Sequence, residues 1–291
     1  MTVLEILQRS TEYLAARGVD SARLNAELLL SHVLQKPRLR LYLEFDRNVT
    51  EADTARAREL VRRRGHREPL QHLTGTAAFL GHELEVSPAV LIPRPETEVL
   101  AQAAIRLLSG REEPSPLRVL DFGTGSGCLA IAIAAAVPFA EVHALDLSTA
   151  ALDTATRNAR RSGVDRIRFH LGDGFAALQS ASGLLPGDLD LLVSNPPYIP
   201  TGDLASLDPE VRDHDPRAAL DGGADGLHFY RRLSREAPAW LKPGAPLLLE
   251  FGDGQAPALQ SLFQDGGWRL EAVEKDLSGT DRILIVRSPT A

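Results

Sequence analysis

An apolar run, a glycine-rich turn and a second apolar run follow one another directly in the sequence. The first run begins at Val119, the turn holds Gly123, Gly125 and Gly127, and the second run covers residues 128–137. The first run has the length of a buried strand and the second that of a helix. Glycines let the backbone approach a ligand without obstruction by Cβ, and the first N–H groups of a helix are free to bind it. The pattern therefore predicts an α/β fold whose glycine turn holds a cofactor.

Polar residues stand where the next apolar runs end. Asp146 lies about twenty residues beyond the turn, where a carboxylate accepts hydrogen bonds from ribose hydroxyls. Asp173 is predicted to meet an adenine amino group, with a helix N-cap as the alternative. Asn195 follows the fourth run, and the carboxyl ends of parallel strands share one ligand cleft. The strands predicted after the turn cover residues 141–145, 167–171, 189–193, 247–251, 268–273 and 283–286.

A short rigid segment follows the fourth predicted strand. It consists of Ser194, Asn195, Pro196, Pro197 and Tyr198. Two prolines fix φ, remove two backbone donors and hold the residue before them out of the helical region. What remains is mostly hydrogen-bond acceptors beside one aromatic face, which suits a planar NH2 group. A plain proline-rich turn is the alternative interpretation.

The chain before the glycine turn divides into a helical part and a β part. Apolar residues recur at helical spacing from Val3 and again from Leu24, and Thr50 is predicted to cap a third helix. Arg62 to Arg64 form a basic run that is either a solvated helix end or a docking site. A β-hairpin connector is predicted next, because glycines and prolines separate short apolar runs. The predicted domains are residues 1–68, 69–92 and 93–291.

Composition restricts the class of protein. The 291 residues are 44% hydrophobic and 24% charged, as in a soluble chain with a substantial core. A net charge of −7 argues against stable nucleic-acid binding through phosphate contacts. One cysteine, Cys128, excludes an intramolecular disulfide, and the eight histidines show no metal-ligand spacing. Residues 1–10 lack a secretory pattern, so we expect a cytoplasmic protein with no membrane partner and no metal site.

The spacing of the turn and three further motifs resemble one known family. Asp121, Gly123, Gly125 and Gly127 stand at alternate positions, which is similar to the class I methyltransferases; Cys128 stands where a dinucleotide pattern needs a small residue. With the motifs at residues 91–98, 194–198 and 215–227, the chain resembles the peptide chain release factor glutamine N5-methyltransferases over nearly its whole length. The resemblance implies a Rossmann-like seven-stranded sheet, a small helical N-terminal domain that docks the substrate, and a methyltransferase domain.

The same resemblance implies the reaction and the residues of the site. S-adenosyl-L-methionine is the implied methyl donor, and the acceptor is the glutamine of the release factors' Gly-Gly-Gln motif. The implied cofactor-binding residues are Gly123, Thr124, Gly125, Ser126, Gly127, Asp146, Asp173, Gly174 and Asn195. The implied substrate-binding residues are Asn195, Pro196, Pro197, Tyr198 and Arg94, of which Asn195, Pro196 and Tyr198 are also the catalytic residues. Gly174 departs from the family, which often has an aromatic residue after this aspartate; here Phe175 comes one position later.

Two other enzyme classes fit the segment at residues 194–198, the acceptor loop. A ribosomal-protein glutamine methyltransferase would share the loop, although the run from Arg94 to Glu98 resembles the release-factor branch more closely. An adenine N6-methyltransferase would present a similar NH2 group after base flipping, but the acidic charge argues against it. An interaction protein with a vestigial fold is a further alternative, which the presence of both motifs disfavours.

Overall fold

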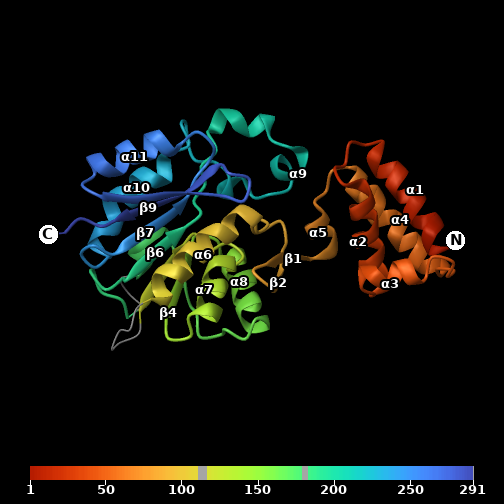
Figure 1. The fold of residues 1–291 in the computed structure, drawn as a ribbon, viewed down its shortest axis with the longest axis horizontal. Helices are drawn as coiled ribbons and strands as arrows, with labels where there is room; N and C mark the ends of the chain where they lie inside the picture. Colours follow the sequence, from red (N-terminus) through yellow and green to blue (C-terminus); the bar gives the residue numbers. More distant parts are fainter. Residues whose placement is uncertain (111–116, 179–182, 291) are drawn as a thin grey trace. The chain divides into compact units, whose positions relative to one another are not determined.

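The structure is a computed structural model that describes residues 1–110, 117–178 and 183–290 (Figure 1). These residues form two compact units. The N-terminal unit comprises Met1–Thr76 together with Leu207–His214, and the remaining described residues form the sheet unit. The domain boundaries that the sequence predicted at residues 68 and 92 stay a prediction.

Helices build the N-terminal unit. Helix α1 begins with the reciprocal hydrogen bonds of a capping box: Thr2 Oγ accepts the Glu5 N–H at 3.2 Å, and the Glu5 carboxylate accepts the Thr2 N–H at 2.9 Å. Thr50 caps α4 as predicted, since its Oγ accepts the Asp53 N–H at 3.1 Å. The apolar faces of α1, α2 and α4 pack into one core. The helices are α1 Val3–Ala15, α2 Ala22–Leu34, α3 Arg38–Leu43, α4 Glu51–Gly65, α5 Leu70–Thr74 and α9 Pro209–Arg212.

The basic run at the end of α4 is not uniformly solvated. Arg62 is exposed and pairs with Glu59, but Arg64 is only 7% exposed. Arg64 donates to Asn25 Oδ1 and to Glu210, each at 2.9 Å. The interpretation of the run as a solvated helix end is therefore wrong for Arg64, whose charge is used inside the N-terminal unit.

The predicted hairpin is present but shorter than its segment. Strands β1 (Thr76–Phe79) and β2 (His82–Glu85) form a two-stranded sheet. The residues before them, in α5, are helical instead, so the β interpretation was wrong there. Pro69 lies at the N-cap of α5, where its missing N–H costs nothing.

A seven-stranded sheet forms the centre of the sheet unit, as predicted. Its order is β5-β4-β3-β6-β7-β9-β8, and the first five strands in this order are parallel. The last two run antiparallel to their neighbours, β9 against β7 and β8 against β9. The strands are β3 Arg118–Phe122, β4 Glu141–Asp146, β5 Arg168–Leu171, β6 Leu191–Ser194, β7 Pro246–Glu250, β8 Arg269–Lys275 and β9 Asp281–Arg287.

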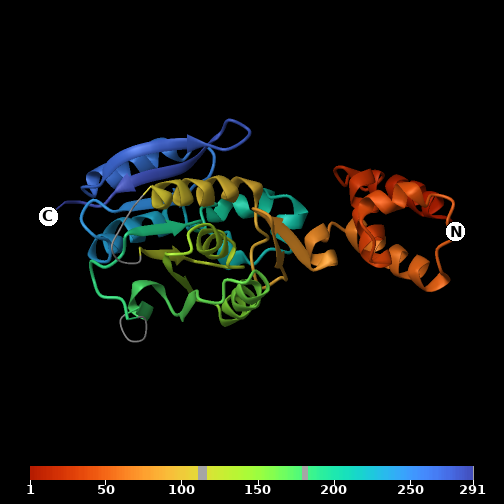
Figure 2. The same cartoon turned by 60° about the horizontal axis from the view of Figure 1, so that its bottom comes forward.

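Helices cover both faces of this sheet (Figures 1 and 2). Helices α6 and α7 pack with α8 on one face, and α6 is seen lengthwise in Figure 2. Helices α10 and α11 pack on the other face. Because both faces are covered, the central parallel strands β3, β6 and β7 are buried along almost their whole length, whereas the edge strand β5 is partly exposed. These helices are α6 Pro95–Ser109, α7 Cys128–Ala136, α8 Thr149–Arg161, α10 His228–Glu236 and α11 Ala256–Asp265, with 3₁₀ turns η1 Gly174–Leu178, η2 Thr201–Ser206, η3 Arg217–Ala219 and η4 Ala237–Ala239.

Two kinds of feature are absent from the described residues. None of the helices in residues 1–110, 117–178 and 183–290 has the length and apolar character needed to cross a membrane. Over the same ranges, no group of three or more histidine, cysteine or acidic side chains could hold a metal ion.

Candidate active site

The glycine turn after β3 is held by the end of β4. The N–H groups of Gly123 and Thr124 both donate to the Leu145 carbonyl at 2.9 Å. The Gly125 N–H donates to Asp146 Oδ2, also at 2.9 Å. The structure thus brings the predicted turn and the predicted strand-end carboxylate together. Asp146 stabilises the turn by accepting this hydrogen bond.

Gly127 and Ser126 hold the glycine turn against helix α8. A Cβ at Gly127 would lie 3.2 Å from the Ala155 backbone of α8 and would sit on a φ of +84°. The Ser126 carbonyl accepts a hydrogen bond from the buried Asn158 side chain at 2.9 Å. These two residues fix where the turn lies, whereas a Cβ at Gly123 or Gly125 would meet nothing within 4 Å.

A buried carboxylate beside the turn has one oxygen without a partner. Asp121 Oδ2 accepts from the Thr124 hydroxyl at 2.6 Å and from the Ala130 N–H at 3.2 Å. Its Oδ1 is buried and has no hydrogen-bond partner among the described residues. Burial raises the pKa of Asp121 to about 7. Asp121 was not among the site residues predicted from the sequence, although an acidic residue inside an apolar strand was the available signal.

The acceptor loop starts next to the glycine turn. Strands β3 and β6 are parallel neighbours, so their carboxyl ends lie at the same edge of the sheet. The buried Ser194 hydroxyl, at the end of β6, donates to the Phe122 carbonyl at 2.6 Å, which ties the two strand ends together. Asn195 therefore leaves the sheet beside the turn that begins at Gly123.

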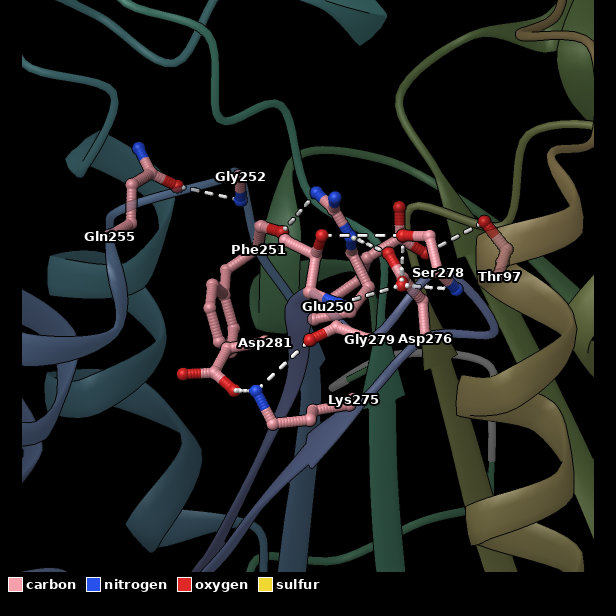
Figure 3. Close-up of polar contacts among 12 residues, drawn as sticks. Thr97, Glu250, Phe251, Gly252, Gln255, Lys275, Asp276, Ser278, Gly279 and Asp281 are labelled. Atoms are coloured by element: carbon pink, nitrogen blue, oxygen red, sulfur yellow. Dashed lines mark hydrogen bonds and ion pairs between the residues drawn. The ribbon is translucent and has the colours of Figure 1, made fainter.

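Asn195 is the outer member of a chain of hydrogen bonds. Its Nδ2 donates to Thr97 Oγ1 at 3.1 Å. Thr97 Oγ1 in turn donates to Glu250 Oε2 at 2.7 Å (Figure 3). Thr97 is 2% exposed and Glu250 1%. Burial raises the pKa of Glu250 to about 7, while hydrogen bonding to Thr97 opposes that rise. Neither Thr97 nor Glu250 was among the predicted site residues.

The rest of the loop is held by its surroundings. The Tyr198 carbonyl accepts from Gln255 Nε2 at 2.9 Å. Gln255 Oε1 accepts from the Gly252 N–H at the same distance (Figure 3). A Cβ at Gly226 would lie 2.3 Å from the Tyr198 carbonyl oxygen. Burial raises the pKa of Tyr198 to about 12, so its phenol stays neutral at physiological pH. Pro196 and Pro197 lie within this fixed loop, with their carbonyls as acceptors.

Two further predicted residues are engaged in ion pairs. Arg94, at the N-cap of α6, donates to Asp215 at 2.5 Å. Asp173 accepts from Arg232 at 2.5 Å, with its side chain 69% exposed. A Cβ on Gly174 would lie 2.1 Å from the guanidinium of Arg232, so a side chain there would displace that guanidinium, and the φ of +68° also favours glycine.

Phe175, which follows Gly174, is used by the core. It is 4% exposed, and its ring lies 5.2 Å from that of Phe122 and 5.9 Å from that of Trp240. Its ring therefore packs in the hydrophobic core of the sheet unit.

Comparison with known proteins identifies the family. Residues 5–75 match a family model described as PrmC N-terminal domain, and residues 100–206 match one described as Methyltransferase small domain. The chain is 44% identical to a release factor glutamine methyltransferase of Geobacter sulfurreducens, over 97% of this chain and 95% of that protein. It is also 44% identical to one of Deinococcus radiodurans, over 99% of both chains. A methyltransferase structure from Pyrococcus furiosus shares the fold with a TM-score of 0.50 and 19% identity, over 73% of this chain and 91% of that chain. The chain belongs to the family of release factor glutamine methyltransferases.

Proposed function

We propose that this chain transfers a methyl group from S-adenosyl-L-methionine to the side-chain amide nitrogen of the glutamine in the Gly-Gly-Gln motif of release factors. One observation carries the proposal. The glycine turn and the Asn-Pro-Pro-Tyr loop leave adjacent parallel strands, and the Ser194 hydroxyl links the two strand ends. A methyl donor held by the turn and an amide held by the loop would therefore meet.

The residues at the turn fit this donor. The unpartnered buried Oδ1 of Asp121 offers a carboxylate oxygen to a positively charged ligand. The space around Gly123 and Gly125 is open, and the carboxylate of Asp146 stands at the end of β4 for ribose hydroxyls. We assign cofactor binding to the turn residues Gly123 to Gly127, with Asp121 added to the predicted set. When bound, S-adenosyl-L-methionine supplies an electrophilic methyl group and retains the electron pair of the broken carbon–sulfur bond.

The ion pair between Asp173 and Arg232 limits how Asp173 can contact adenine. Asp173 keeps an exposed side chain, but one of its oxygens already accepts from Arg232. Contact of Asp173 and Gly174 with adenine is proposed to occur beside this ion pair. Arg94 likewise reaches substrate only with its pairing to Asp215 kept, or exchanged for a group of the substrate.

The loop residues fit an amide acceptor. An amide nitrogen is a poor nucleophile because its lone pair is delocalised, and complete loss of that resonance costs on the order of 18–20 kcal/mol. Asn195 Oδ1 and the Pro196 carbonyl would accept the two N–H bonds of the glutamine amide, with Tyr198 providing a flat apolar wall. Holding the amide in this orientation can contribute roughly 7–11 kcal/mol. The nitrogen releases one of its protons to solvent as the new carbon–nitrogen bond forms.

The remaining parts are assigned by the same proposal. Residues 1–68 would dock the protein substrate, residues 69–92 would connect, and residues 93–291 would carry the methyltransferase site. Translation termination occurs in the cytoplasm, where a release factor would be available as partner.

Methyl transfer from labelled cofactor tests the proposal. We expect labelling of an intact release factor, and none when the motif glutamine is replaced by glutamate, which has no amide nitrogen. Ribosomal proteins and DNA serve as competing acceptors. Labelling of either of these, with the release factor left unlabelled, would refute the proposed substrate.

A further inference from the structure

We propose that Thr97 and Glu250 are positioning residues that fix which end of the Asn195 amide faces the acceptor. The inference rests on the proposed function, because it concerns how Asn195 serves a glutamine amide. Thr97 and Glu250 would act through Asn195 and would touch neither substrate nor cofactor.

Three separate elements bring these side chains together. Thr97 lies in the first turn of α6, Glu250 ends β7, and Asn195 directly follows β6. Strands β6 and β7 are parallel, with Ser194 opposite Leu249, so the next residues along each strand are also neighbours. Asn195 and Glu250 thus leave the sheet side by side, and Thr97 bridges them from the helix layer with contacts of 3.1 and 2.7 Å.

The direction of these hydrogen bonds decides the orientation of Asn195. An ionised carboxylate only accepts, so the Thr97 hydroxyl gives its one proton to Glu250. The Thr97 oxygen can then only accept, and the atom of Asn195 that reaches it must be the NH2 group. Asn195 Oδ1 is left as the outward acceptor. Without this chain, the two ends of the amide would compete for the same position.

Neighbouring charged and polar groups act on the same carboxylate. Arg282 of β9 and a hydrogen bond from the Asn195 side chain favour its ionised form, and Glu96 of α6 disfavours that form. The Tyr230 hydroxyl of α10 donates to the backbone carbonyl of Glu250 at 2.8 Å, which fixes the backbone there. Arg282 also donates to the next carbonyl, that of Phe251, at 3.0 Å.

Burying a carboxylate in a protein core costs free energy. Removing a charged group from water without a matched charge costs several kcal/mol, and an apolar side chain would pack in its place at no such cost. Ionisable groups of this kind concentrate at functional sites. Glu250 is 1% exposed, and its hydrogen bond leads through Thr97 to the acceptor loop. A role in orienting Asn195 accounts for its presence there.

Substitution of Thr97 tests the inference. Thr97→Val keeps the shape and removes the hydroxyl, whereas Thr97→Ser keeps the hydroxyl. Assays at about pH 8 keep Glu250 ionised, since its pKa is raised to about 7. We expect Thr97→Val to lower kcat for release factor methylation by about 10–100-fold, taking as a guide the range for partners that orient metal-ligating side chains. The Kd for S-adenosylhomocysteine should stay near the wild-type value, and Thr97→Ser should restore most of the rate.

Two further comparisons separate positioning from folding. Glu250→Gln keeps an acceptor for the Thr97 hydroxyl but adds an NH2 donor, so its activity should lie between those of wild type and Glu250→Met, and Glu250→Met should behave like Thr97→Val. In an Asn195→Ala background, Thr97→Val should cost nothing more, because both changes remove the same contribution. If Thr97→Val does not fold, Thr97→Ala carries the same comparison.

The outcomes distinguish the inference from the function it rests on. An active wild type with an equally active Thr97→Val variant would overturn the inference alone. If Thr97→Val lowers kcat by the same factor in the wild-type protein and in the Asn195→Ala variant, the inference would also be overturned. A wild type that methylates no release factor would overturn the proposed function, and the positioning role with it.

Discussion

Asn195 has a donor group and an acceptor group, and the described residues engage the donor, through Thr97 and Glu250. Replacing Asn195 by alanine removes the proposed acceptor and leaves both prolines in place. We expect kcat/KM for the release factor to fall roughly a hundredfold or more. This fall corresponds to a loss of about 2.7–4 kcal/mol of transition-state stabilisation. Steady-state kinetics would give this value, and calorimetry with S-adenosylhomocysteine should give an unchanged Kd.

Aspartate at the same position provides the matched control. Asn195→Asp keeps an acceptor but loses the donor to Thr97, so its activity should lie between those of wild type and Asn195→Ala. Loss of cofactor affinity in proportion to activity in the alanine variant would contradict the assignment of Asn195 to the acceptor amide.

Two buried carboxylates make stability depend on pH in an unusual direction. Burial raises the pKa of Glu250 and of Asp121 to about 7, from ordinary values of 4.5 and 3.8. Between these values the folded protein holds protons that the unfolded chain has lost. The free energy of unfolding should therefore fall as pH rises from about 5 to about 7, with each group contributing up to ~1.4 kcal/mol per pH unit. Urea unfolding of the cofactor-free protein across this range measures the slope.

Glu250→Gln isolates one of the two groups. Glutamine does not titrate, so the variant should lose stability less steeply than wild type over the same range. Identical slopes in the two proteins would show that Glu250 does not hold a proton there.

At the scale of elements, two glycines of one turn serve different purposes. Gly127 has a φ of +84°, and a Cβ there would press on the α8 backbone at 3.2 Å; Gly125 has a φ of +55° with nothing within 4 Å. Gly127→Ala should lower the free energy of unfolding by about 1–3 kcal/mol, because strain and overpacking add. Gly125→Ala should cost only about 1 kcal/mol of stability. Its main effect should be weaker cofactor binding, since the new methyl group would project into the open space at the turn.

Denaturant unfolding and calorimetry together check this pair. If Gly125→Ala binds S-adenosylhomocysteine as wild type does, the cofactor does not lie against Gly125. If both variants are equally unstable, contact with α8 is not the reason for glycine at position 127.

The elements that could be predicted from the sequence are those with a long, uniform pattern. The central parallel strands could be predicted because runs such as 191–193 are buried on both faces and hence apolar. Helices α3 and α5 could not, because they have six and five residues and so complete less than two turns. Local turn chemistry predicted the cap at Thr50 but gave no indication that helix would occupy Leu70–Thr74.

The same distinction applies to the site. Positions of Asp146 and Asn195 could be predicted because each directly follows an apolar strand. Their partners could not all be predicted, since Thr97 is separated from Asn195 by 98 positions and from Glu250 by 153. Likewise, the pairing of Asp173 with Arg232 depends on a helix 59 positions away. Such contacts arise from the sheet order, which no local pattern encodes.

At the scale of the whole molecule, one arginine joins two distant stretches of the N-terminal unit. Arg64 of α4 pairs with Glu210 of α9 at 2.9 Å, and Arg67 pairs with the same carboxylate at 2.6 Å. Arg64→Ala should lower the free energy of unfolding by about 3 kcal/mol, the lower end for breaking a buried ion pair, because Arg67 remains as a partner. Denaturant unfolding of the full chain would give this difference.

Arg62→Ala is the matched control in the same helix. Arg62 is exposed and pairs only on the surface of α4 with Glu59, so its loss should change stability little. Equal effects of the two substitutions on the free energy of unfolding would mean that burial of Arg64 contributes nothing to the stability of the N-terminal unit.

The N-terminal unit is assembled from two stretches of chain, Met1–Thr76 and Leu207–His214, and the second is encoded between β6 and β7. This discontinuity limits recombination. A chimera that received only the first stretch would carry Arg64 and Arg67 without the Glu210 carboxylate they share. Exchanging the N-terminal unit between related enzymes therefore requires moving both stretches together, because the unit is not one continuous segment.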